Sequence, residues 1–382
     1  MSTQLSAGRD PDHRWRDWAE QRPATPGPHF DNAAAGRSAT SVLRATCDHA
    51  LLEAQIGAYV AEELASPVLD AGRAALAELL GVPPEGLAFV ESATGALKAL
   101  LAAWPLEIGD TVAVAPSEWG PNMEAFADRG LQVTELAVRD DGEIDLEHLR
   151  RLLATSPPAA VHLTQVASHR PLVQPVAEAA ELCRAAGVPL WVDAAQALGH
   201  VDTASGADAI YSTSRKWLAG PRGVGMLGIA ETWWDTLKIR VPAMAEGGLP
   251  VVRLLESHEA HVAGRVGLSL AARQHLELGP AAVRLRLSEV GRGTRASLEG
   301  MAGWHVLGPF DSPSAITALR PTDGQDLTAT RARLIGEHGI LTTVAATARA
   351  PREMSAPLLR ISPHVDCTPD DLARLRSALS TS

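Results

Sequence analysis

Lysine is scarce in this chain of 382 residues, in which Lys98, Lys216 and Lys238 are the only lysines among 34 basic residues. Arginine stays protonated and forms no Schiff base, whereas a lysine amine can lose its proton and react. A lysine retained in such an arginine-rich chain is therefore a candidate for chemistry that arginine cannot perform, although a surface lysine can also persist by chance.

Cysteine is scarce as well, because the three cysteines Cys47, Cys183 and Cys367 lie far apart and form no CxxC pair. This pattern argues against a disulfide framework and against a cysteine zinc site. We expect Cys183, which falls in an apolar helical pattern, to be a core residue. The segment His258-Glu-Ala-His261 is one residue short of a zinc-protease motif, so we expect no metal site.

Positive charge is in deficit, since 45 acidic and 34 basic residues give a net charge of −11. Nucleic acids and anionic membranes bind clustered positive charge, so we expect neither as a partner. No apolar run approaches the roughly 20 residues of a membrane helix. The polar stretch from Met1 to Asp10 does not resemble a signal peptide. These features predict a soluble, cytoplasmic protein.

Strand-like and helix-like patterns alternate along the chain from residue 71. We expect strands over residues 87–91, 111–115, 132–138, 159–164, 189–193, 209–212 and 223–229. Helices are expected over 71–80, 94–104, from about 121, over 145–154 and over 176–186. Such alternation predicts an α/β fold with a mostly parallel sheet covered by helices, which binds ligands beyond the carboxyl ends of its strands.

The pattern also divides the chain into three parts. Residues 1–30 are rich in Pro, Arg and Trp and are expected to form an N-terminal arm with a short helix near 12–22. Residues 31–256 are expected to form a large domain around the sheet. Residues 257–382 contain helical patterns near 263–278 and 283–301 and strand patterns near 314–319 and 358–362. They predict a smaller α+β C-terminal domain.

Two polar clusters follow neighbouring expected strands. In Pro189-Leu-Trp-Val-Asp-Ala-Ala-Gln196 an apolar strand ends in Asp193. A buried carboxylate there calls for a cation such as a pyridinium nitrogen, although a helix N-cap is an equally good interpretation of this segment alone. After the next strand, hydroxyls and Arg215 suit a phosphate, and Lys216 suits a bond to an aldehyde of the same molecule. The alternative for Lys216 is a solvated surface lysine.

A third cluster, Glu91-Ser-Ala-Thr-Gly-Ala-Leu97, opens a helix directly after a strand. Free backbone N–H groups, the Thr94 hydroxyl and the helix dipole form an anion site, although this is also a common capping pattern. The spaced glycines of a dinucleotide fingerprint are missing.

Together these segments resemble the class V aminotransferase family of fold-type I pyridoxal-phosphate enzymes, which includes cysteine desulfurases and kynureninases. The resemblance runs from Phe30-Asp-Asn-Ala-Ala-Ala-Gly36 to Leu359-Arg-Ile-Ser-Pro-His-Val365. It implies the fold-type I transferase fold, pyridoxal 5′-phosphate as cofactor, and a homodimer with active sites at the subunit interface.

The resemblance also implies residue roles. Lys216 matches the catalytic Schiff-base lysine, Asp193 the partner of the pyridinium nitrogen, and Gln196 the residue that binds the phenolic oxygen. The full set of cofactor-binding positions is Thr94, Gly95, Trp119, Asp193, Gln196, Thr213, Arg215 and Lys216.

Within that set, Thr94, Thr213 and Arg215 match phosphate binders, and Arg215 stands where many relatives have His. Trp119 falls where the family places a ring, usually His, against the cofactor face.

The substrate side is also implied by the resemblance. Arg360 matches the arginine that binds the substrate carboxylate, and its planar fork suits bidentate capture. Gln165 falls where relatives carry an Asn near the substrate. Tyr59 and Trp217 are candidates for holding a quaternary ammonium group by cation–π attraction.

One departure from the family pattern affects the expected reaction. Cysteine desulfurases carry a nucleophilic cysteine shortly before the carboxylate-binding arginine, but residues 343–354 contain none, and Cys367 follows Arg360. A persulfide mechanism is therefore not expected. A finer resemblance, to family members that cleave cysteine sulfoxide conjugates, is carried by the segments 57–62, 67–73, 162–170, 193–200 and 214–223.

We therefore expect a carbon–sulfur lyase that eliminates a sulfenic acid from a small-molecule cysteine sulfoxide conjugate and leaves pyruvate and ammonia. The sulfenic acid would then be reduced by a thiol. Lys216 must be neutral to take the Cα proton, so its pKa must fall well below about 10.4. An aminotransferase or another cysteine-conjugate β-lyase is the alternative. A catalytically silent binding domain is disfavoured, because such a relative would lose Lys216 or Arg360 first.

Overall fold

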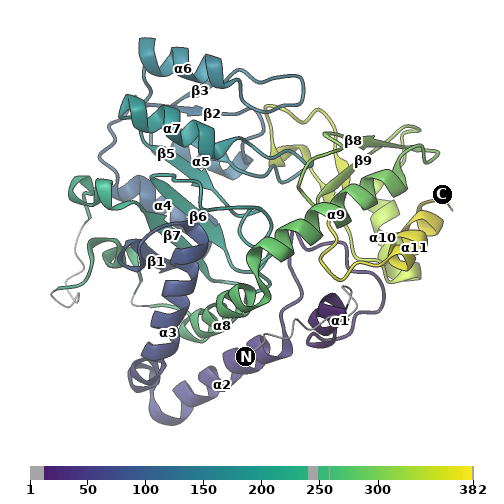
Figure 1. Ribbon diagram of the computed structural model, residues 1–382, viewed down its shortest axis with the longest axis horizontal. Coiled ribbons are helices and arrows are strands. Elements are labelled where there is room, and N and C mark those ends of the chain that lie inside the picture. The colour runs from purple at the N-terminus through teal and green to yellow at the C-terminus, as the bar shows by residue number, and fades with distance from the viewer. Residues whose placement is uncertain (1–12, 240–247, 258, 381–382) are drawn as a thin grey trace, which may run out of the picture.

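The computed structural model describes residues 13–239, 248–257 and 259–380, and the residues discussed below lie in these ranges. Two sheets form separate lobes (Figure 1). The larger sheet has seven strands in the order β1-β7-β6-β5-β4-β2-β3, and the smaller has four in the order β10-β11-β9-β8. His258 of the discounted zinc-like motif lies outside the described residues.

The large sheet follows the predicted strands closely. Its strands are β1 (Leu87–Val90), β2 (Thr111–Val114), β3 (Gln132–Glu135), β4 (Ala160–Thr164), β5 (Leu190–Asp193), β6 (Ala209–Thr213) and β7 (Gly225–Ile229). Five of them, β3, β2, β4, β5 and β6, pair in parallel, whereas β7 runs antiparallel between β6 and β1. The predicted mostly parallel sheet is confirmed.

Helices cover both faces of this sheet, which is why its central strands are continuous apolar runs rather than alternating ones. On one face, α4 (Ala93–Ala103) and α5 (Gly120–Asp128) contribute to a core that includes Phe126 and Trp191. On the other, α6 (Leu146–Thr155) and α7 (Val176–Ala186) contribute to a core that includes Leu149 and Cys183. Cys183 is a buried core residue, as expected.

A third group of helices extends beyond the large sheet. The chain forms α2 (Thr40–Ile56), α3 (Ala58–Leu80) and α8 (Val262–Leu278), which pack against one another along one side of the molecule (Figure 1). The periodic pattern predicted only the second half of α3 and missed α2. Several apolar side chains of these helices point outward, so their sequence lacks a single apolar stripe.

The smaller lobe contains β8 (Trp304–Leu307), β9 (Thr317–Pro321), β10 (Thr343–Ala345) and β11 (Leu358–Ile361) in an antiparallel sheet. The helices α9 (Pro280–Leu298), α10 (Leu327–His338) and α11 (Pro369–Ser380) pack with it. The division into residues 1–30, 31–256 and 257–382 remains a proposal. The packing of α8 against α2 and α3 favours a later start for the small domain.

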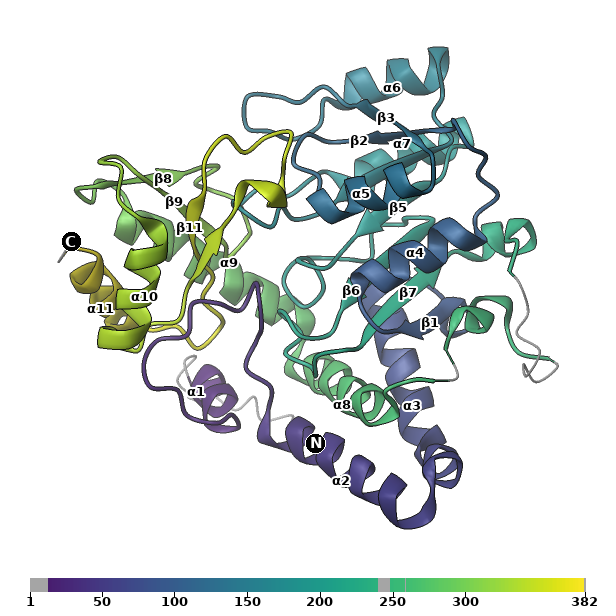
Figure 2. The same ribbon diagram turned by 180° about the vertical axis from the view of Figure 1, so that it is seen from behind.

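The N-terminal segment connects the two lobes. After α1 (His13–Glu20), the Phe30 amide donates to Leu341 O at 2.9 Å and the Ser362 amide donates to Phe30 O at 2.8 Å. Six residues after Phe30, the Gly36 amide donates to Arg215 O at 2.7 Å. The segment therefore crosses from the small lobe to the carboxyl edge of the large sheet (Figure 2).

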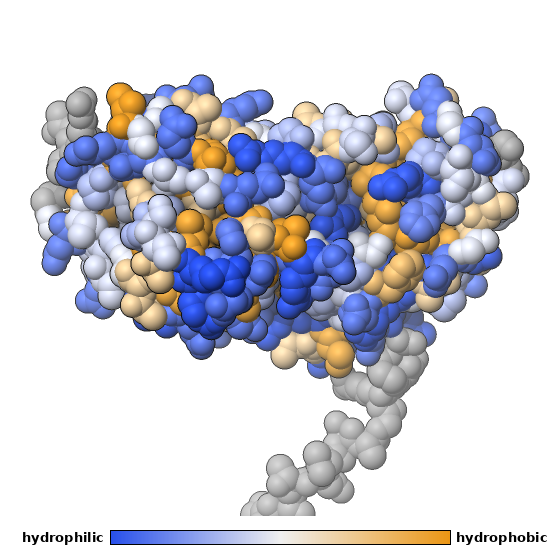
Figure 3. Space-filling model, turned by 90° about the horizontal axis from the view of Figure 1, so that it is seen from above, coloured by the Kyte–Doolittle hydropathy of each residue, from blue (hydrophilic) through white to orange (hydrophobic). Residues whose placement is uncertain are grey.

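The outer surface carries both hydrophilic and hydrophobic residues. On the face drawn in Figure 3, hydrophilic residues surround small clusters of hydrophobic ones. Within the described ranges, none of the helices has the length and apolar character needed to cross a membrane.

Candidate active site

The polar residues predicted at separate strand ends come together at the carboxyl edge of the large sheet. Thr164 at the end of β4 is in register with Asp193 at the end of β5, and Asp193 is in register with Tyr211 of β6. Lys216 follows β6 by three residues. A cavity at this edge is lined by Ser92, Ala93, Thr94, Trp119, Asn122, Thr164, Ser168, Asp193, Ala195, Gln196, Thr213, Arg215 and Lys216.

Asp193 is a carboxylate with almost no access to solvent, at 4% exposure. Its Oδ2 accepts a hydrogen bond from Asn122 Nδ2 at 2.9 Å, and its Oδ1 accepts one from the Ala195 amide at 2.8 Å. Both donors are neutral. Burial raises the pKa of Asp193, and the nearby charge of Lys216 partly offsets that rise. Such a carboxylate is stabilised by a cationic ligand.

Lys216 has an unusually acidic ammonium group. Burial lowers its pKa to about 7, against the opposing effect of Asp193 and with further lowering by Arg215, Arg360 and Arg349. A substantial fraction of the amine is therefore neutral near pH 7, in the form that can attack an aldehyde or accept a proton.

The end of the cavity lined by Ser92, Ala93, Thr94 and Thr213 lies where β1 and β6 flank β7. Val90 and Thr213 are both in register with Gly225, so the turn at Ser92 and the end of β6 meet there. A Cβ atom at Gly225 would lie 2.9 Å from the Ser92 carbonyl carbon, so only glycine permits this approach. Ser92 Oγ caps α4 by accepting from the Gly95 amide at 3.0 Å. Ser92, Ala93 and Thr94 at the start of α4 line this end of the cavity, and the free amides of a helix N-terminus are suited to bind an anion.

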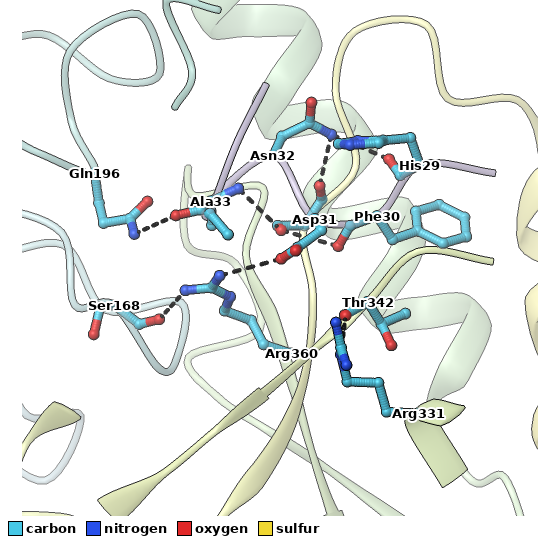
Figure 4. Close-up of polar contacts among 12 residues, drawn as sticks. His29, Phe30, Asp31, Asn32, Ala33, Ser168, Gln196, Arg331, Thr342 and Arg360 are labelled. Carbon is cyan, nitrogen blue, oxygen red and sulfur yellow. Dashed lines mark hydrogen bonds and ion pairs between the residues drawn. The ribbon is translucent and has the colours of Figure 1, made fainter. Parts of the chain in front are cut away.

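Two further predicted cofactor residues are held by the N-terminal segment. Arg215 donates to the Ala34 carbonyl. Gln196 donates from Nε2 to Ala33 O at 2.8 Å (Figure 4) and accepts from Trp217 Nε1 at 2.9 Å. An amide nitrogen carries two hydrogens, so Gln196 keeps one donor for a ligand.

These residues fit pyridoxal phosphate. The buried Asp193 suits the ring nitrogen as a cation, Lys216 suits the aldehyde, and the hydroxyls at the N-terminus of α4 with Arg215 suit the phosphate. Trp119 supplies an aromatic ring to the cavity wall. The chemistry of the donor set thus matches each functional group of the cofactor.

Arg360 lies beside this cavity, in β11 of the small lobe. Its Nη1 donates to Ser168 O at 2.8 Å and its Nη2 lies 3.4 Å from Asp31 Oδ1 (Figure 4). Its Nε is buried and has no partner among the described residues. A fully buried guanidinium with an unused donor, next to the cavity-lining Ser168, is suited to bind a carboxylate.

Three residues expected near the substrate lie elsewhere. Gln165 lines a different hollow and donates to Asp202 O at 2.6 Å, because it follows the cavity-lining Thr164 and side chains alternate along a strand. Tyr59 is 78% exposed at the start of α3, where α2 and α3 meet, and it does not line the cavity. Trp217 is buried and stacks on His200 with ring centroids 3.9 Å apart. None of the three is brought to the cavity of this chain.

A buried polar network behind Asp193 was not predicted. Glu118 accepts from Asn122 Nδ2 at 2.8 Å and Thr164 Oγ1 at 2.6 Å, and its Oε2 lies 3.0 Å from His162 Nδ1. His162 Nε2 in turn lies 2.8 Å from the Tyr211 hydroxyl. Through Asn122 this network fixes the carboxylate of Asp193. A sequence signal existed, since Glu118 closely follows an apolar strand and Asn122 lies one helical turn later.

The acidity of Lys216 can be tested on unloaded protein. Because the neutral amine attacks the aldehyde, we expect the rate of cofactor attachment to rise with a midpoint near pH 7. It should be about tenfold slower at pH 6 than on its plateau above pH 8. Stopped-flow absorbance would measure the rate, and borohydride reduction with peptide mass spectrometry would identify the lysine.

Lys98 and Lys238, both exposed, provide the internal control for that measurement. Neither lines the cavity, so we expect little of the cofactor to be found on either of them after reduction. A rate of attachment to Lys216 that climbed steadily through pH 9 would contradict the lowered pKa.

Comparison with known proteins agrees with this geometry. The sequence model described as aminotransferase class-V matches residues 29–330. The chain is 48% identical, over 95% of its length and 92% of the relative, to the "Probable hercynylcysteine sulfoxide lyase" of Mycobacterium tuberculosis (strain CDC 1551 / Oshkosh).

Solved structures show the same fold. The cysteine desulfurase CsdA of Escherichia coli has a TM-score of 0.83 at 20% identity, covering 97% of this chain and 98% of that one. The cystine C–S lyase C-DES, in complex with its product cysteine persulfide, has a TM-score of 0.82 at 18% identity. That match covers 93% of this chain and 98% of the other.

Proposed function

We propose that this chain, which belongs to the class-V aminotransferase family of pyridoxal-phosphate enzymes, is a carbon–sulfur lyase acting on hercynylcysteine sulfoxide. The observation that carries the proposal is one cavity joining a lysine of pKa about 7, a buried carboxylate and a neighbouring arginine with an unused donor. The similarity to the mycobacterial relative supports the choice of substrate.

The residues of the cavity divide the work of holding the cofactor. Asp193 would pair with the ring nitrogen, Gln196 would donate to the phenolic oxygen, and Trp119 would contact the ring. Thr94, Gly95, Thr213 and Arg215 would hold the phosphate, and Lys216 would hold the aldehyde carbon covalently. Bound in this way, pyridoxal phosphate supplies an electron sink that stabilises negative charge at the substrate Cα.

Proton movement is assigned to Lys216. Once the substrate amine has displaced it, its neutral Nζ can accept the proton from Cα. Arg360 would hold the substrate carboxylate, which fixes Cα beside Lys216. The pKa of Lys216 near 7 suits both removal and return of a proton at neutral pH.

The proposed net reaction is an elimination followed by hydrolysis. The Cα–H bond and the Cβ–S bond break, the sulfur leaves with its electron pair and takes up a proton as a sulfenic acid, and a Cα–Cβ double bond forms. Addition of water then gives pyruvate and ammonium. Two thiol groups, oxidised together to a disulfide, would reduce the sulfenic acid to ergothioneine with release of water.

The test uses purified, cofactor-loaded protein with hercynylcysteine sulfoxide and a reducing thiol. We expect pyruvate and ergothioneine to appear in equal amounts, faster than in a control without enzyme. If neither appears while the visible band of the bound cofactor is intact, the substrate is wrong, although the cofactor assignment is not.

Transamination by the same residues is the second candidate, because it begins with the same removal of the Cα proton. It would yield a keto acid that retains the sulfur side chain, together with an aminated cofactor. Residues 343–354 contain no cysteine, which favours both candidates over a persulfide mechanism. Product analysis separates the two.

We also propose a homodimer in the cytoplasm. Outward-facing apolar side chains gather on α2 and α3, and these are Leu43, Leu51, Ile56, Tyr59, Val60, Leu64 and Val68. A cluster of this kind on two packed helices is typical of a surface covered by a partner. A second copy of the chain is the partner that the family resemblance implies.

Charged substitutions on this surface should separate the subunits. We expect Leu51→Asp combined with Leu64→Asp to weaken dimerisation at least about 10²-fold, since both side chains are more than half exposed and would face a desolvated interface. Sedimentation velocity would measure the mass. Ile108→Asp, 83% exposed but away from α2 and α3, is the matched control. A wild-type protein that sediments as a monomer would contradict the proposal.

A further inference from the structure

Positive charge exceeds negative charge around the cavity. Arg215, Arg360 and Arg349 all lower the pKa of Lys216, so all three lie within its electrostatic range. Asp31 is the carboxylate that offsets them, and its Oδ1 lies 3.4 Å from Arg360 Nη2. Several buried or half-buried arginines that share one carboxylate indicate that anionic ligands complete the site.

Two of these arginines already have assigned ligands. Arg215 belongs to the phosphate end, and Arg360 to the substrate carboxylate. Arg349 has no such assignment. Among the described residues its guanidinium forms no hydrogen bond or ion pair, and it lies over the ring of Trp119 with Cζ 5.5 Å from the ring centroid. Burial lowers the pKa of Arg349, and Asp31 opposes that shift.

Arg349 is held beside Trp119 by the backbone. It ends the short helix η4 (Thr347–Arg349), which packs against α5. A Cβ atom at Gly120 would clash with the Ala348 carbonyl oxygen, so the close approach depends on glycine directly after Trp119. The position of the guanidinium next to a cavity-lining ring is therefore fixed by two segments that are far apart in the sequence.

We propose that Arg349 binds a second carboxylate of the substrate, so that the site selects cysteine conjugates that are acidic at both ends. This inference rests on the proposed function. In hercynylcysteine sulfoxide one carboxylate belongs to the cysteine part and the other to the betaine part. Arg360 takes the first and Arg349 the second, and the Asp31 carboxylate stabilises the two guanidinium groups while no substrate is bound.

The test compares two pairs of ligands with each protein. One pair is hercynylcysteine sulfoxide and the same molecule with the betaine carboxylate replaced by hydrogen. The other pair is ergothioneine and its decarboxylated analogue. Both lack the cysteine part of the substrate, and they differ only in the betaine carboxylate. Titration calorimetry of the second pair reports binding at this subsite independently of turnover.

We expect Arg349→Gln to raise KM for the full substrate at least about tenfold with kcat changed less than about threefold, as for loss of a charged hydrogen bond. KM for the analogue should change less than about twofold. Ergothioneine binding should weaken by at least about tenfold, and Arg349→Lys should retain part of the affinity.

Arg352→Gln is the matched control. Arg352 lies in the same loop but is exposed, and its Nη1 is 3.2 Å from Glu135 Oε2 at the surface. It should behave as wild type. An equal rise in KM for the two substrates on Arg349→Gln would overturn the inference. So would wild-type protein that binds ergothioneine no better than its decarboxylated analogue. Failure of wild type to release pyruvate from either substrate would instead count against the proposed function.

Discussion

Replacing Lys216 by alanine is expected to lower the rate of pyruvate formation by at least about 10³-fold. The substitution removes both the covalent attachment of the cofactor and the amine that accepts the Cα proton, and general base catalysis alone contributes about 10²- to 10⁴-fold. The free energy of unfolding should change little, because burial of the Lys216 amine, which lowers its pKa, itself costs free energy in the folded state. Coupled assay of pyruvate, with thermal unfolding in parallel, would measure both effects.

Lys98→Ala is the control for that variant, since Lys98 is exposed on α4 and does not line the cavity. It should retain wild-type turnover. A small primary amine added to Lys216→Ala should restore part of the lost rate by acting as the base. Turnover of Lys216→Ala within about tenfold of wild type would show that another group removes the proton.

The sequence predicted the sheet and the centre of the site because both depend on local patterns. Apolar strands buried on both faces end abruptly in polar residues, as β5 does at Asp193 and β6 does at Thr213. Parallel strands place their carboxyl ends at one edge, so residues 23 positions apart, Asp193 and Lys216, were expected to meet. The cavity contains both, with Gln196 and Arg215.

Residues whose role depends on the distant course of the chain were not predictable in this way. Glu118 and His162 meet only because β4 lies beside β2 in the sheet, and no local pattern indicates that contact. Arg349 reaches Trp119 through packing of the small lobe on α5. Gln165 was expected near the substrate but does not line the cavity. It lies one residue beyond Thr164, and this step turns its side chain to the opposite side of the strand.

The missed helices have a related cause. α2 and the first half of α3 carry apolar side chains on their outer as well as their inner faces, so no single stripe marks a buried side. Such a pattern arises when a helix face is covered by something outside the chain. The outward-facing apolar side chains made these helices hard to predict from periodicity, and they also support the proposed dimer.

Asp193→Asn is expected to lower cofactor affinity and turnover strongly, because it removes the negative charge of a buried carboxylate. The substitution keeps the shape of the side chain but removes the anion that would pair with the ring nitrogen. Breaking a buried charge pair by removing one partner costs about 3–5 kcal/mol, which corresponds to cofactor binding weaker by about 150- to 5,000-fold. Turnover at saturating cofactor should also fall about 10²-fold or more, since the ring no longer withdraws electrons as a cation.

The stability of the unloaded protein distinguishes this effect from general damage to the fold. Burial raises the pKa of Asp193, so the charged form is disfavoured there, and its neutralisation should not destabilise the protein through loss of charge. Any loss should come from Asn122, whose Nδ2 donates to Asp193 Oδ2 and would meet an N–H group in one orientation of the introduced amide. The free energy of unfolding without cofactor should therefore fall by no more than about 1–2 kcal/mol, the value of one hydrogen bond between side chains.

The matched control is Asp202→Asn, which removes a carboxylate that is exposed and lies 3.5 Å from Arg284. It should bind cofactor and release pyruvate as wild type does. If Asp193→Asn unfolds at the wild-type temperature yet also keeps wild-type cofactor affinity and turnover, the ring nitrogen is not paired with this carboxylate. If it loses affinity while remaining folded, the buried charge acts on the ligand rather than on the fold, as the two neutral donors to Asp193 indicate.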